Sequence, residues 1–187
     1  DGESGDWSLD REQLLSDLSI LAADDMQGRA VGTDGNARAR AYIIDRLEAM
    51  GVEPVGDSYE HGFSFEMPRT REKVDGTNIL ARIEGASDSA RTMVVSAHFD
   101  HEGMRGEQIW NGADDNASGV ASVLAVAEMF MAEPPEHDVI FAFVDAEENG
   151  LQGARAFVAD PPIPVDNITF NLNMDMVAMS TDRILWA

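Results

Sequence analysis

The sequence predicts an α/β fold, a three-layer sandwich in which a mostly parallel central sheet carries helices on both faces. In the second half of the chain, short apolar runs alternate with helical segments, which is the order of a parallel sheet with crossover helices. Three of the runs are followed by a histidine or by acidic residues, at the sheet edge where open α/β folds bind ligands. These runs are residues 93–97, 138–144 and 168–174.

Each remaining element has its own local signal. Asp10, with Gln13 three residues later, forms a helix-capping pair before leucines at helical spacing. Gly51 stands where a helix takes a left-handed cap. The expected helices are residues 11–23, 36–50, 117–131 and 151–159, and the further expected strands are residues 60–66 and 77–84.

Composition limits the functions that the chain could have. Its 187 residues suffice for one domain with an ordinary core, and no apolar run approaches the ~20 residues of a membrane span. Thirteen Lys and Arg against 35 Asp and Glu give a formal net charge of -22, which disfavours nucleic acid and favours divalent cations. The lack of cysteine excludes thiolate zinc sites and disulfides.

Both ends of the sequence led to further expectations. The chain starts at Asp1 with a polar stretch, and a removed signal peptide would explain this, which predicts a periplasmic or extracellular protein. Residues 183–187 begin as a strand would and then stop, which predicts that the last strands and helices of the domain are missing. A shortened sheet would expose an apolar edge, so we expect self-association.

The loop of residues 111–119, NGADDNASG, is the most informative candidate site. Its simplest interpretation is a turn before a helix, because Asp, Asn and Ser are good caps. However, two adjacent carboxylates at a buried junction repel each other unless a cation neutralises them. We therefore predict a metal here, with Asp114 bridging two cations and Asp115 holding a ligand in place.

Histidine and further carboxylates follow the three strands. His98 and Asp100 alone are weak evidence, but a carboxylate that binds the second ring nitrogen would orient a metal-bound imidazole. Glu147 and Glu148 leave their strand in different directions, so one could bind metal while the other moves a proton. A solvated acidic loop is the alternative for this pair, and a helix cap or turn is the alternative for Asp175.

The other histidines are assigned mainly to surface or loop positions. They are His61, His101 and His137, of which only His101 is near enough to His98 in sequence to line the same pocket. No serine lies in a Gly-x-Ser-x-Gly elbow, so the inventory is that of a metal site and not of a hydrolytic triad.

Taken together, four motifs resemble the co-catalytic two-zinc aminopeptidases, the bacterial leucyl aminopeptidase-like zinc exopeptidases. Residues 21–52 also resemble the N-terminal helical part of bacterial members. The motifs are His98-Phe99-Asp100, residues 111–119, Glu147-Glu148 with Gly150-Leu151 and Gly153, and Asn173-Met174-Asp175-Met176.

The resemblance implies that residues 1–187 are the N-terminal portion of a single zinc peptidase catalytic domain. Such a domain hydrolyses the N-terminal peptide bond of peptides or proteins, because the zinc pair lowers the pKa of a water and polarises the scissile carbonyl. Glu147 is the implied general base and acid, Asp100 the residue that orients His98, and the Asp114–Asp115 peptide the expected cis bond. The implied zinc ligands are His98, Asp114, Glu148 and Asp175.

The sequence departs from this family at one ligand. The second zinc of the family takes a histidine from well beyond Asp175, and no histidine follows residue 137 here. Three protein ligands suffice for one zinc, so we expect one or two Zn²⁺ in this chain. A single-zinc enzyme related to glutaminyl cyclases and a catalytically inactive metal-binding domain remain as alternatives.

Overall fold

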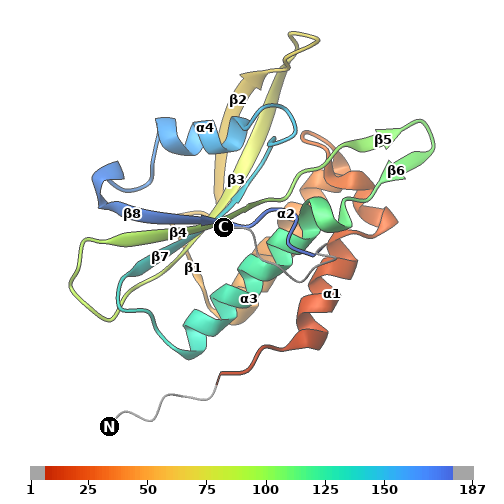
Figure 1. The fold of residues 1–187 in the computed structure, drawn as a ribbon. Helices are drawn as coiled ribbons and strands as arrows, with labels where there is room; N and C mark the ends of the chain where they lie inside the picture. The colour runs from red at the N-terminus through yellow and green to blue at the C-terminus, as the bar shows by residue number, and fades with distance from the viewer. Residues whose placement is uncertain (1–6, 179–187) are drawn as a thin grey trace.

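Six strands form one mixed sheet in the computed structural model, which describes residues 7–178 (Figure 1). The strand order is β1-β3-β7-β4-β8, and β2 pairs with the N-terminal part of β3. The strands are β1 (Glu53–Pro54), β2 (Glu60–Glu66), β3 (Lys73–Ile83), β4 (Thr92–His98), β7 (Asp138–Val144) and β8 (Ile168–Asn173).

The sheet is parallel where the sequence alternates strands with helices. β4 runs parallel to both β7 and β8, and helical crossovers connect them. β3 runs antiparallel to β7, and β1 and β2 run antiparallel to β3. The predicted α/β class is therefore confirmed, with a mixed sheet whose parallel part is formed by the later strands.

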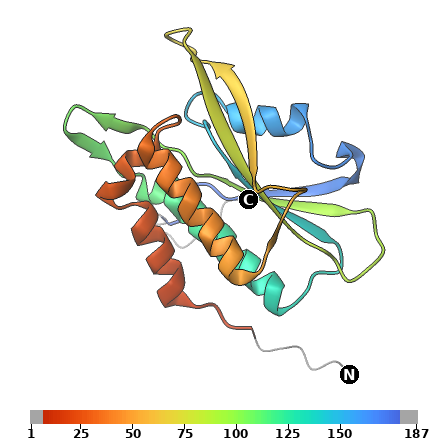
Figure 2. The same ribbon diagram turned by 180° about the vertical axis from the view of Figure 1, so that it is seen from behind.

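Helices cover both faces of this sheet. The first face carries α1 (Arg11–Leu21), α2 (Asp34–Met50) and α3 (Gly119–Ala132), and the second carries α4 (Gln152–Ala159). Figures 1 and 2 show these two groups of helices on opposite sides of the strands. Alternate residues of β7 enter the two cores, Phe141 on the three-helix side and Ala142 on the α4 side, as strand geometry requires.

The helix boundaries follow from local chemistry. The Asp10 carboxylate accepts hydrogen bonds from the first turn of α1, and Gly51 ends α2 with a φ of 76°. In α3, Val120, Val123 and Leu124 are buried at helical spacing against the sheet. No helix of the described residues is both long and apolar enough to cross a bilayer.

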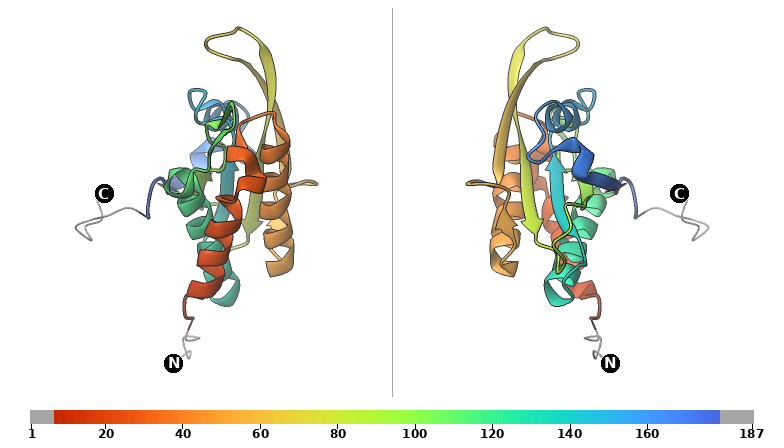
Figure 3. Two further views of the ribbon diagram at one scale, coloured as in Figure 1. Left: turned by 90° about the vertical axis from the view of Figure 1, so that its right-hand side faces the viewer. Right: turned by 90° about the vertical axis from the view of Figure 1, so that its left-hand side faces the viewer.

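Several segments differ from the sequence prediction. The helix expected from residue 117 begins at Gly119, because a π-helical turn, η2 (Ala113–Ser118), precedes it. The long loop after β4 contains a small hairpin, β5 (Gly103–Arg105) with β6 (Gln108–Trp110), and the hairpin of β2 with β3 projects beyond the helices (Figure 3). The strand start expected at residues 183–187 lies outside the described residues.

Candidate metal centre

The three parallel strands bring their acidic ends to one edge of the sheet. In the strand register, His98 of β4 lies beside Val144 of β7, and Ser96 of β4 lies beside Asn173 of β8. Because the strands are parallel, the residues that follow each strand emerge at the same edge. The fold therefore gathers His98, Asp175 and the loop after β7, as the sequence predicted.

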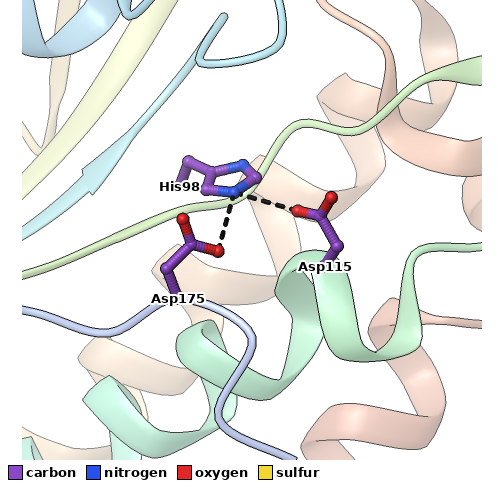
Figure 4. A group of neighbouring side chains, drawn as sticks. All are labelled: His98, Asp115 and Asp175. Carbon is purple, nitrogen blue, oxygen red and sulfur yellow. Dashed lines mark ion pairs between the residues drawn. The ribbon is translucent and has the colours of Figure 1, made fainter. Parts of the chain in front are cut away.

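The first group of candidate ligands consists of His98, Asp115 and Asp175 (Figure 4). His98 Nε2 lies 3.1 Å from Asp115 Oδ1 and 3.5 Å from Asp175 Oδ1. The three side chains come from the end of β4, from η2 and from the segment after β8. His98 is buried, whereas the two carboxylates are partly exposed, so the group is open to solvent on the carboxylate side.

The other nitrogen of His98 determines the tautomer of its ring. Nδ1 lies 3.1 Å from the main-chain oxygen of Asp100, and a carbonyl oxygen can only accept, so Nδ1 carries the proton. Nε2 is then the nitrogen that faces the two carboxylates, and it would release its own proton on binding a metal. Burial lowers the pKa of His98, but the nearby carboxylates of Asp100 and Asp175 outweigh burial and raise the pKa to about 9.

The Asp100 carboxylate organises the glutamate pair. Its two oxygens accept hydrogen bonds from the main-chain N–H groups of Glu147, at 3.0 Å, and Glu148, at 3.2 Å. Its Oδ1 lies 3.6 Å from Nδ1 of His98, beyond hydrogen-bond distance. Asp100 thus contacts His98 chiefly through its main-chain oxygen, while its carboxylate fixes the turn that presents Glu147 and Glu148.

A second group of candidate ligands shares Asp115 with the first. It consists of His101, Asp115 and Glu148, whose ligand atoms all lie within 4.8 Å of one another. Nδ1 of His101 is 2.7 Å from Glu148 Oε1 and 3.9 Å from Asp115 Oδ2. The two oxygens of Asp115 therefore face different groups, which is the arrangement of a bridging carboxylate.

Asp114 lies in neither group. Its Oδ1 accepts a hydrogen bond from the main-chain N–H of Ala178 at 3.0 Å. Asp115, not Asp114, faces both groups, and the cis peptide bond lies between Asp115 and Asn116, not between Asp114 and Asp115. The predicted and observed positions differ by one residue. Consecutive side chains of η2 point in different directions, and the sequence alone does not show which of them faces the histidines.

Glu147 and Glu148 lie close to other carboxylates, which changes their pKa values. Burial, with the charges of Asp115 and Asp100, raises the pKa of Glu148 to about 7. Burial also raises the pKa of Glu147, although the neighbouring His98 opposes it. So many carboxylates in one place disfavour each other's charged form, and a bound cation would relieve this repulsion.

The donor set and the distances fit zinc. A tetrahedral zinc with bonds of ~2.0 to 2.2 Å places neighbouring ligand atoms about 3.3 Å apart. The separations of 3.1 and 3.5 Å from Nε2 of His98 bracket this value. In the second group, the 2.7 Å contact of His101 with Glu148 is a direct hydrogen bond that must open to admit a metal.

Two cavities border the site. One of about 370 Å³ lies between α4 and the sheet, and its lining combines His98, Glu147 and Asp175 with apolar side chains such as Phe157 and Ile168. Another of about 530 Å³ is lined by His101, Glu148 and residues 67–70 of the β2–β3 loop. Both candidate metal groups therefore adjoin space that a substrate could fill.

Sequence reasoning gives three residues of this site less weight than the structure does. It assigns His101 mainly to the surface with a possible place in the pocket, it gives Asp115 a supporting role, and it does not single out Asn116. Buried Asn116 donates to the main-chain oxygen of Met174 and so joins η2 to the segment that carries Asp175. The spacing of His101 from His98 was a signal, but only the β4-to-β5 turn shows that both rings face Asp115.

Comparison with known families agrees with this geometry. The model of a family described as Peptidase family M28 matches residues 78–187, more than half of the chain. The chain belongs to peptidase family M28. The matched region contains every candidate ligand of both groups, and the prediction of a zinc-peptidase relationship is confirmed.

Curated relatives of this M28 chain include fungal proteases. A vacuolar membrane protease of Schizosaccharomyces japonicus is 37% identical over 125 residues, which are 63% of this chain and 14% of that protein. A probable zinc metalloprotease of Pyricularia oryzae is 36% identical over 159 residues, which are 80% of this chain and 31% of that protein. The chain thus spans less than a third of these relatives.

Solved structures share the fold of this M28 chain. A leucine aminopeptidase precursor from Bacteroides thetaiotaomicron has a TM-score of 0.74 at 19% identity, covering 92% of this chain and 64% of that one. A glutaminyl cyclase from the same organism has a TM-score of 0.73 at 20% identity, covering 91% and 63%. At such identities the likeness concerns the fold alone, and it confirms the predicted zinc exopeptidase-like architecture.

The expected periplasmic or extracellular location is wrong. It rested on the non-methionine start of the sequence, whereas the matching curated proteins include several fungal vacuolar membrane proteases, named for an internal membrane. A polar N-terminal stretch has many origins, so it was a poor guide to the compartment.

Proposed function

We propose that this chain carries the metal centre of a zinc-dependent aminopeptidase, which hydrolyses the N-terminal peptide bond of peptides or proteins. One observation carries the proposal. Glu147 lines the same cavity as His98 and Asp175 but belongs to neither candidate metal group. A hydrolase needs such an unbound carboxylate beside its metal, and a purely structural metal site does not.

Two zinc positions follow from the shared carboxylate. Asp115 would be shared by both positions, and His101 would give the second position a nitrogen donor. Zinc bound there supplies Lewis acidity and a lowered pKa for water. The proposed ligands are His98, Asp115 and Asp175 for one ion, and His101, Asp115 and Glu148 for the other.

The chain's own residues then divide the remaining work. Glu147 accepts the proton of the attacking water and returns it to the leaving amine. The Asp100 carboxylate holds the main chain of Glu147 and Glu148, so that the two side chains keep separate tasks. The negative site attracts the ammonium group of a free N-terminus, and the apolar cavity beside α4 accommodates the first side chain of the substrate.

Zinc content and hydrolysis of aminoacyl-nitroanilides test this function, in the chain and in the longer protein that contains it. We expect two zinc ions per chain, and Glu147→Gln should reduce kcat by about 10²-fold or more while retaining zinc, because only the proton carrier is lost. Glu84→Gln is the control, since the Glu84 side chain is 83% exposed and distant from both groups. Zinc binding without hydrolysis, unaltered by Glu147→Gln, would defeat the proposal.

A glutaminyl cyclase is the alternative enzyme, because cyclases of several bacteria share this fold. It would cyclise N-terminal glutamine and would need one zinc. Release of pyroglutamyl peptide in place of free amino acid, with one zinc per chain, would favour it. An inactive metal-binding domain would bind zinc and catalyse neither reaction.

We also propose that residues 1–187 belong to one catalytic domain that self-associates through β8. In the described residues, β8 pairs with β4 alone, and Phe170 and Leu172 of β8 are 56% and 39% exposed. An apolar edge strand of this kind pairs readily with a second chain.

A further inference from the structure

Arg29 is a fully buried arginine beneath the candidate metal centre. Its guanidinium binds main-chain oxygens in place of a carboxylate, and it forms no ion pair within residues 7–178. Nε donates to Phe99 at 2.7 Å, and the two terminal nitrogens donate to Leu21, to Asn111 at 2.7 Å and to Gly112 at 2.9 Å. One side chain thus holds three separate segments of main chain.

Two of those segments carry candidate zinc ligands. Phe99 stands between His98 and Asp100, at the end of β4. Asn111 and Gly112 lead directly into η2, which carries Asp115. Arg29 therefore ties the main chain beside His98 to the main chain that leads to Asp115, and these two side chains must meet at 3.1 Å.

The Gly112 position shows how closely these segments approach each other. Gly112 has a φ of 59°, and a Cβ placed on it would lie 2.2 Å from the main-chain oxygen of Asp115 and 2.6 Å from the ring of His101. No side chain fits there, so the carbonyl of Gly112 is presented inward to Arg29 by a turn that only glycine allows.

Arg29 is itself fixed by a buried polar chain. Asn36 donates to the main-chain oxygen of Arg29 at 3.2 Å and to Asp145 Oδ1 at 2.9 Å. Asp145 directly follows β7 and also accepts a hydrogen bond from the N–H of Thr77 in β3. These hydrogen bonds connect Arg29 to Asp145, two residues before Glu147. Through Arg29 they also reach the main chain beside His98 and the main chain before Asp115.

The charge of Arg29 also suits its location. Burial lowers the pKa of Arg29 to about 10, while the charges of Asp100, Asp115 and Glu148 act in the opposite direction. Arg29 is therefore a cation at neutral pH, placed under an acidic cluster. Lysine would supply the same charge but has no planar fork of five donors, so it cannot bind four carbonyls at once.

We propose that Arg29 is a positioning residue that pre-organises the zinc ligands by holding the main chain next to His98 and before Asp115. It acts through those segments and touches neither metal nor substrate. The inference rests on the proposed metal centre, and it adds a residue from the N-terminal helical part of the chain, outside the matched residues 78–187.

Zinc affinity, measured by competition with a chelator, tests the inference without any activity assay. Arg29→Lys retains the charge and should weaken zinc binding by about 10- to 100-fold, as for other residues that support metal ligands. The matched control is Arg46→Lys, since Arg46 holds Asp17 in the contact of α1 with α2, remote from the site. The control should bind zinc within about twofold of the parent, because distant sites that share no partners act nearly independently.

Each outcome decides one of the two proposals. A parent chain that binds no zinc refutes the proposed function. A parent that binds zinc, together with an Arg29→Lys protein that binds it equally well, refutes the role of Arg29. Should Arg29→Lys fail to fold, Asn36→Ala frees the main chain of Arg29 more gently, and unchanged zinc affinity in that variant overturns the inference.

Discussion

The Asp114 carboxylate accepts a hydrogen bond from the main-chain N–H of Ala178, three residues beyond Asp175, at 3.0 Å. Asn116 contacts the same segment through the oxygen of Met174 and the N–H of Met176. The two side chains of η2 on either side of Asp115 therefore hold the segment that carries Asp175, while Asp115 itself faces the histidines.

Replacing Asp114 and Asp115 by asparagine, one at a time, should separate these roles. Asp115→Asn should remove most zinc from both positions, because the side-chain amide is a poor metal ligand and no longer bridges. Asp114→Asn should retain zinc and lower the free energy of unfolding by about 1 kcal/mol, since it weakens a hydrogen bond to Ala178. Metal analysis and urea unfolding measure the two effects, and equal zinc loss in both variants would return the bridging role to Asp114.

Asp100→Asn should affect the glutamates more than His98. The amide retains one acceptor oxygen but turns its NH₂ toward an N–H of the Glu147–Glu148 turn, which disrupts one of two hydrogen bonds. We expect kcat to fall by about 10- to 100-fold. In NMR spectra of the zinc-free protein, recorded above the His98 pKa of about 9 so that the ring is neutral, His98 should keep its Nδ1–H tautomer, because that proton is donated to a main-chain oxygen. A changed tautomer would show that the carboxylate orients the ring after all.

Asp145 should make stability depend on pH. Burial raises its pKa from 3.8 to about 6, with the charge of Asp100 acting in the same direction and the hydrogen bonds from Thr77, Asn36 and Ala146 opposing. The folded state thus prefers the protonated acid, so this contribution to stability is complete below pH 3.8 and is lost as the pH rises through about 6. The loss by pH 7 amounts to about 3 kcal/mol.

Comparison with Asp145→Asn isolates that group. As the pH rises from 4 to 7, the unfolding free energy of the parent should fall relative to that of the variant. Denaturant unfolding of the zinc-free proteins measures both values. A difference that stays constant over this interval would mean that Asp145 keeps an ordinary pKa in the fold.

The edge strand predicts concentration-dependent assembly. Replacing Phe170 and Leu172 with lysine adds charge to the exposed edge of β8 and should shift sedimentation from larger species to monomer. The substitutions lie on exposed positions, so the thermal midpoint should change little. A parent that sediments as a single monomer at all concentrations speaks against self-association.

Much of the site could be predicted because it lies at strand ends. Apolar runs identify β4, β7 and β8, and parallel strands must deliver His98, Glu147, Glu148 and Asp175 to one edge. Local patterns were sufficient for this, since each strand and its first polar residues are adjacent in sequence.

The choice between Asp114 and Asp115 could not be made in that way. Both residues lie in one π-helical turn, and their directions depend on the turn's contacts with Met174 and Ala178, about 60 residues away. The role of His101 likewise depends on the hairpin that follows β4, and no hydrophobic pattern in the sequence predicts that hairpin.

By itself, the sequence determined the fold class, the order of strands and helices, and an acidic, cysteine-free site at the ends of the parallel strands. These properties follow from periodicity and composition, which act over a few residues at a time. The tertiary structure alone decided which carboxylate joins the two histidines, and it placed Arg29 beneath them. Those outcomes depend on distances between segments remote in sequence, and such distances are set only when the chain packs.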